Sequence, residues 1–176
     1  MAYINIKSGE ILYEIKSFYR TFEFLKDKVE QRNNLMTQKY FDNAKYLELD
    51  SYYPSYVVNS CFLAELELKF LLAITGVEFK SGNKGHDLSY LFNLMADTNK
   101  NELKQHYQNL LALYNKTSNY NEDLIKQLMA HSSYSYRDFR YMWERTSHRY
   151  ENYFMDMFVT VTYKYIIEKF GSMFYI

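Results

Sequence analysis

Apolar residues recur along most of the chain at steps of three and four, which is the period of an amphipathic α-helix. The first such run predicts a helix from about Gly9 to the Arg32-Asn33-Asn34 region, with Ser8 as its N-terminal cap. Its apolar positions are Ile11, Ile15, Phe18, Phe22 and Leu25. The following segment, 38–50, has helical spacing in part and stays ambiguous.

The clearest element is a helix predicted over 54–75. Pro54 suits a first helical turn, and Gly76 stands where a C-terminal cap belongs. The segment is apolar on nearly every side, which is typical of a helix surrounded by others. We therefore expect it to be the central and most buried helix of a bundle.

Further helices are predicted towards the C-terminus. Asp87 is the expected cap of a short helix whose inner face carries Leu88, Leu91, Phe92 and Met95. Helices are also expected over 101–115 and 122–131. The segment 136–170 is one helix or two, with Thr146-Ser147 as the alternative joint, and it ends at Gly171.

No strand-like alternation persists, and no repeat or low-complexity tract is present. The pattern predicts an all-α, single-domain up-and-down bundle of about five to seven helices over residues 1–176.

Composition narrows the function classes. With 21 basic and 21 acidic residues the net charge is zero, so a nucleic-acid partner must be argued from local clusters. The single cysteine, Cys61, excludes an internal disulfide and a cysteine-based metal site, and we expect it to be a small buried hydrophobe. We expect neither cofactor nor metal. The chain shows no signal peptide and no apolar run long enough to span a bilayer, which predicts a cytoplasmic protein with no membrane partner.

Three charged residues interrupt the central apolar helix. Glu65 and Lys69 are four residues apart, the favourable order for a helical ion pair, and Glu67 lies between them. Since charged side chains usually face water, we expect all three to line the one solvated stripe of this helix.

The chain resembles the HEPN superfamily over residues 59–91. The resemblance rests on the stretch Asn59–Lys69, which holds a Glu-x-x-Leu-Lys-type pattern, and on Gly85-His86-Asp87-Leu88 followed by Leu91. The segment Asp138–Glu144 is similar to an aromatic-rich Arg-Tyr segment of some bacterial members. The resemblance implies a compact helical bundle, often dimeric. Many members are metal-independent RNases of toxin–antitoxin, abortive-infection or CRISPR systems, and others are non-catalytic binding modules.

The resemblance also implies a catalytic pattern, an Arg followed after four to six residues by a His, often continuing as His-x-Tyr. The chain has His148-Arg149-Tyr150, but only two residues separate Arg145 from His148, and seven separate Arg140 from His148. In this interpretation His148 transfers protons, and Arg140 or Arg145 stabilises the charge at phosphorus. In a continuous helix Arg137, Arg140, Tyr141, Glu144 and His148 would share one face, which is equally typical of an exposed stripe with an Arg140–Glu144 pair.

Local clustering favours an RNA surface in the same segment. Four of the six arginines lie within thirteen residues, interleaved with aromatic residues. Arginine pairs with phosphates and aromatic rings stack on unpaired bases, although dimer interfaces enrich the same residue types. The expected RNA-binding residues are Arg137, Tyr141, Trp143, Arg149 and Tyr150.

His86 is interpreted as a structural residue, with its ring tying the loop before it to the central helix through Glu65; Lys69 and Glu144 are expected to support the site in the same way. Two functions stay open. The first is a metal-independent endoribonuclease, a toxin or phage-defence effector acting as a homodimer, with an antitoxin or a nucleotidyltransferase as a further partner. The second is a non-catalytic HEPN-like module that binds a protein or an RNA.

Overall fold

The computed structural model describes residues 2–38, 42–80, 85–113, 129–130, 132 and 152–174. Helices make up nearly all of these residues, and none of them forms a β-strand. The predicted all-α bundle is therefore confirmed for the described part of the chain. Within that part, no helix is long and apolar enough to cross a membrane.

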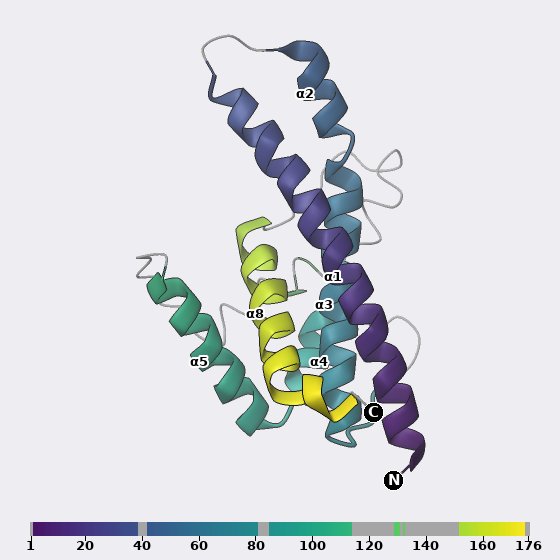
Figure 1. The fold of residues 1–176 in the computed structure, drawn as a ribbon. Helices are drawn as coiled ribbons and strands as arrows, with labels where there is room; N and C mark the ends of the chain where they lie inside the picture. Colours follow the sequence, from purple (N-terminus) through teal and green to yellow (C-terminus); the bar gives the residue numbers. More distant parts are fainter. Residues whose placement is uncertain are drawn as a thin grey trace.

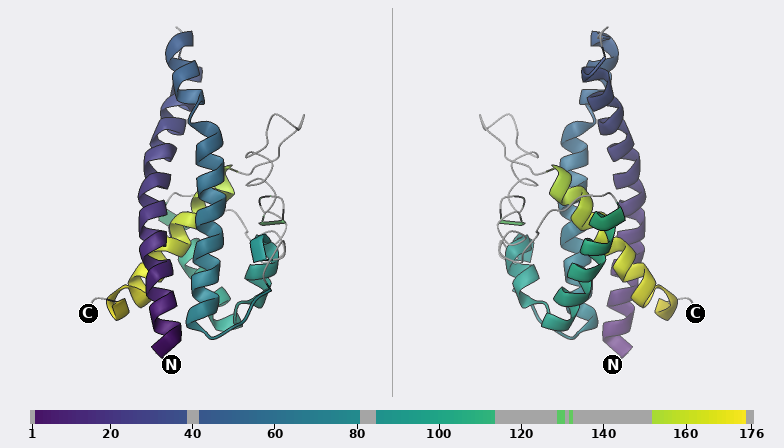
Figure 2. Two further views of the ribbon diagram at one scale, coloured as in Figure 1. Left: turned by 90° about the vertical axis from the view of Figure 1, so that its right-hand side faces the viewer. Right: turned by 90° about the vertical axis from the view of Figure 1, so that its left-hand side faces the viewer.

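Two long helices form the axis of the fold. α1 (Ala2–Met36) and α3 (Tyr53–Ile74) lie side by side, and the short α2 (Asn43–Asp50) connects them at one end of the molecule (Figure 1). α8 (Asn152–Phe170) crosses this pair obliquely, as Figure 2 shows, and continues into a 3₁₀ turn, η3 (Gly171–Phe174). α5 (Asp97–Leu113) packs on α8, and α4 (Leu88–Leu94) packs on α3.

The core forms where α1, α3 and α8 meet. α1 buries residues spaced three or four apart, including Leu12, Ile15, Tyr19, Phe22 and Leu25. Tyr19 stacks flat on Tyr163 of α8, with ring centroids 3.6 Å apart. α3 contributes the largest number of buried side chains, so its prediction as the central helix is confirmed.

Several helix ends lie where the sequence predicts them. Pro54 stands in the first turn of α3, and Gly76 closes its C-terminal end with a φ of 70°. The Asp87 side chain caps α4 by accepting a hydrogen bond from the Tyr90 amide at 3.0 Å. α8 ends at Phe170, directly before Gly171.

Other boundaries are wrong in the sequence-based prediction. α1 begins at Ala2, so Ser8 lies inside a helix and is not its cap. The ambiguous segment contains α2, which the Asp42 side chain caps. α5 begins at Asp97, four residues before the predicted start, because Asp97 and its neighbours suit a first helical turn.

Candidate functional site: a buried carboxylate joining two helices

A buried carboxylate on α3 forms the centre of a polar cluster. The Glu65 side chain is 5% exposed, and its Oε1 accepts a hydrogen bond from Lys69 Nζ at 2.6 Å. The Nδ1 atom of His86 lies 3.0 Å from both carboxylate oxygens. A buried carboxylate needs such partners, because taking its charge out of water costs several kcal/mol.

The loop between α3 and α4 holds His86 in place. Gly85 precedes it in a tight bend, where an added Cβ atom would lie 2.7 Å from the Lys80 carbonyl oxygen. The Lys80 amide donates to the Tyr90 hydroxyl at 3.2 Å, and Asp87 caps α4. Glycine is therefore required at position 85, and the Gly85-His86-Asp87 sequence fixes the imidazole against α3.

This geometry joins the two parts of the sequence pattern on which the family resemblance rests. Glu65 and Lys69 come from α3, and His86 comes from the loop just before α4, twenty-one residues after Glu65. His86 ties the loop to the central helix through Glu65, as interpreted from the sequence. Lys69 is not a freely solvated charge either, since its side chain is 20% exposed and its Nζ lies 5.6 Å from the centre of the Phe79 ring.

The predicted solvated stripe on α3 is wrong for both glutamates. Glu65 is buried with partners, and Glu67 is fully buried, with neither carboxylate oxygen hydrogen-bonded to any residue that the structure describes. Burial raises the pKa of Glu67 well above its ordinary value of 4.5, so the protonated form is favoured. The error arises because single-residue tendencies place Glu in water, whereas α3 is enclosed by α1, α4 and α8.

The remaining predicted site residues lie outside the described residues. These are Arg137, Arg140, Tyr141, Trp143, Glu144, Arg145, His148, Arg149 and Tyr150. Their roles stay predictions, as does the continuity of the helix through Thr146-Ser147. Cys61 is buried as predicted, with its Sγ 3.6 Å from the Ser132 carbonyl oxygen. Within the described ranges, no three His, Cys, Asp or Glu residues gather in a way that would hold a metal ion.

A second polar cluster, missed by the sequence analysis, connects α5 and α8. The Tyr165 hydroxyl lies 2.7 Å from Glu102 Oε2 and accepts a hydrogen bond from Lys169 Nζ at 3.0 Å, and Lys169 also pairs with Glu102. The hydrogen bond from Lys169 lowers the pKa of Glu102, and that same bond raises the pKa of Lys169. The cluster is thus a clamp between two helices. The four-residue spacing of Tyr165 and Lys169 was the available signal.

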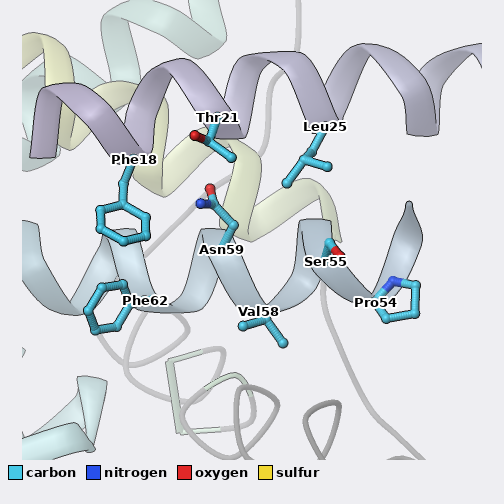
Figure 3. A pocket seen from close by; sticks show the side chains of 8 residues that line it. All are labelled: Phe18, Thr21, Leu25, Pro54, Ser55, Val58, Asn59 and Phe62. Atoms are coloured by element: carbon cyan, nitrogen blue, oxygen red, sulfur yellow. The ribbon is translucent and has the colours of Figure 1, made fainter. Parts of the chain in front are cut away.

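A groove of about 500 Å³ lies between α1 and α3 (Figure 3). Phe18 and Leu25 contribute from α1, and Val58 and Phe62 from α3. Asn59 points from α3 towards α1; it is 7% exposed, and its Oδ1 has no hydrogen-bond partner among the described residues. The groove is mainly apolar, and its polar lining residues are Thr21, Ser55 and Asn59.

Comparison with known proteins yields no relative: no family model, no curated protein and no solved structure matches the chain.

Proposed function

We propose that the protein is a HEPN-type, metal-independent endoribonuclease that acts as a homodimer. One observation carries the proposal: the contact of His86 with the buried Glu65 carboxylate joins the two separate parts of the HEPN-like pattern. A chance likeness in sequence would not require a glutamate and a histidine twenty-one residues apart to meet. The resemblance then extends to the C-terminal Arg-rich segment and its His148-x-Tyr150 pattern.

The proposed chemistry is attack of the ribose 2′-hydroxyl on the neighbouring phosphorus. His148 transfers a proton near neutral pH, and Arg140 or Arg145 stabilises the negative charge that develops on the phosphoryl oxygens. The aromatic side chains of Tyr141 and Trp143 stack on unpaired bases, while Arg137 and Arg149 pair with phosphates. A toxin or phage-defence role, with an antitoxin or nucleotidyltransferase as partner, is part of the same proposal.

The test compares cleavage of single-stranded RNA by the wild-type protein and two histidine variants. His148→Ala should lower the cleavage rate by about 10²–10⁴-fold, the usual loss when a general acid–base group is removed. His106→Ala is the matched control, since His106 is a partly exposed histidine on α5 and is not part of the Arg-rich stretch of the sequence. Equal rates for wild type and His148→Ala would contradict the assignment of His148.

The second candidate function is a non-catalytic HEPN-like module that binds a protein or an RNA. The groove between α1 and α3, with its mainly apolar lining, favours this alternative. Ser55→Arg places a long side chain at the exposed rim of the groove. If the module function is correct, the wild-type protein binds RNA or a partner without cleaving it, and Ser55→Arg abolishes the binding.

A further inference from the structure

His86 is held by one ring nitrogen and presents the rest of its ring to solvent. Its Nδ1 contacts the buried Glu65 carboxylate at 3.0 Å, whereas its side chain is 55% exposed. Within the described part of the chain, Nδ1 is the only ring nitrogen of His86 with a hydrogen-bond partner. Fixing the loop to α3 uses Nδ1 alone, so Nε2 has no structural task there.

The Glu65 carboxylate determines which ring nitrogen of His86 carries the proton. An ionised glutamate only accepts hydrogen bonds, so Nδ1 must donate to Glu65. In the neutral ring Nε2 is then unprotonated, with its lone pair directed away from Glu65. When Nε2 takes up a proton, the adjacent carboxylate stabilises the imidazolium that forms. Lys69 Nζ, at 2.6 Å from Oε1, helps to keep the Glu65 carboxylate in place.

We propose that His86 is a second proton-transfer residue, with Nε2 as the base that takes the proton of the ribose 2′-hydroxyl. This inference rests on the ribonuclease function proposed above. As Nε2 takes the proton, the 2′-oxygen forms a bond to phosphorus and the bond from phosphorus to the 5′-oxygen breaks. The leaving 5′-oxygen takes a proton from the acid, assigned to His148. The products are a 2′,3′-cyclic phosphate and a 5′-hydroxyl, and the imidazolium of His86 then returns its proton to solvent.

Glu65 is a positioning residue in this scheme, since it acts on the substrate only through His86. The separation of tasks between the two ring nitrogens makes the proposal testable. In His86→Asn, the side-chain NH₂ group occupies the region of Nδ1 and preserves the donor to Glu65, but nothing replaces Nε2. A purely structural histidine should therefore tolerate this change, and a proton-transfer residue should not.

The experiment measures RNA cleavage against pH for wild type, His86→Asn and the matched control His106→Asn. We expect His86→Asn to keep the wild-type circular dichroism spectrum and melting temperature, to lose about 10²–10⁴-fold in cleavage rate and to lose the rise of the rate with pH that reports a base. His106→Asn should retain both the rate and the pH profile. Wild-type cleavage by His86→Asn would overturn the proposal and leave the ribonuclease function intact.

A second measurement determines directly which ring nitrogen of His86 carries the proton. Nitrogen-15 NMR of the wild-type protein should show neutral His86 with its proton on Nδ1, and the proton on Nε2 would overturn the assignment of the base. A wild-type protein that cleaves no RNA would instead refute the proposed ribonuclease, and the catalytic role of His86 would fall with it. The failure of the further inference and that of the proposed function are thus distinguishable.

Discussion

Glu67→Gln isolates the energetic effect of an ionisable group enclosed in the core. Glu67 is fully buried on α3, and within the described ranges neither of its carboxylate oxygens has a hydrogen-bond partner. Burial, and then the charge of Glu23, raise the pKa of the Tyr19 hydroxyl, so this nearby group stays neutral. Glutamine has nearly the same shape and cannot ionise, so the substitution removes the titration and little else.

The sign of the pH dependence follows from the direction of the shift. The pKa of Glu67 is raised in the folded protein and is about 4.5 in the unfolded chain, so above pH 4.5 unfolding releases a proton. The wild-type protein therefore loses stability as the pH rises above 4.5, until the pH reaches the folded-state pKa. Each pH unit in this window costs about 1.4 kcal/mol, and Glu67→Gln avoids that cost.

Urea unfolding followed by far-ultraviolet circular dichroism at several pH values measures the effect. Near pH 4 the two proteins should differ by no more than about 0.5 kcal/mol, and the advantage of Glu67→Gln should then grow by about 1.4 kcal/mol per pH unit. Glu14→Gln, at an exposed position of α1, is the matched control and should show no such trend. A difference that is constant with pH, or that favours the wild type as the pH rises, would refute the argument.

Two further substitutions test the helix end and a partly buried ion pair. Gly76→Ala should destabilise the protein by about 1 kcal/mol in thermal unfolding, because φ at this position is 70° and the cost comes from the backbone alone, with no described atom near the added Cβ. The control Gly171→Ala should be nearly neutral, because its added Cβ meets only the Ile167 side chain, at an ordinary contact distance of 3.5 Å. Lys26→Met should lower the stability by about 1 kcal/mol at pH 7, because burial raises the pKa of Asp156 and Lys26 Nζ, 3.6 Å away, opposes that shift. The loss should shrink towards pH 4, where Asp156 becomes protonated. A loss of the same size at both pH values would contradict this explanation.

Features decided by neighbouring residues were predictable from the sequence. Gly76 and Asp87 mark helix ends because backbone conformation and capping depend on a few adjacent groups. The apolar period of α1 likewise predicts its buried face. The prediction of Ser8 as a cap was wrong because serine also occurs within helices. The residues before Ser8 are helical, and α1 therefore begins at Ala2.

Features that depend on contacts between distant segments were harder to predict from the sequence. Whether Glu65 and Glu67 face water depends on which helices enclose α3, and the sequence does not state that arrangement. The two glutamates are two residues apart and equally polar, yet one has Lys69 and His86 as partners and the other has none. The contact with His86 was foreseen only because the family resemblance singled out that residue. The clamp of Glu102 with Lys169 crosses between α5 and α8, so the spacing of Tyr165 and Lys169 within α8 does not reveal their partner on α5.

The termini of cleaved RNA test the central claim most directly. Single-stranded RNA is incubated with the wild-type protein in excess EDTA, with His148→Ala in parallel, and the fragment ends are identified by mass spectrometry. The account predicts cleavage that survives EDTA and leaves a 2′,3′-cyclic phosphate and a 5′-hydroxyl, with His148→Ala slower by about 10²-fold or more. Intact RNA with the wild-type protein, or cleavage that EDTA abolishes, would contradict it.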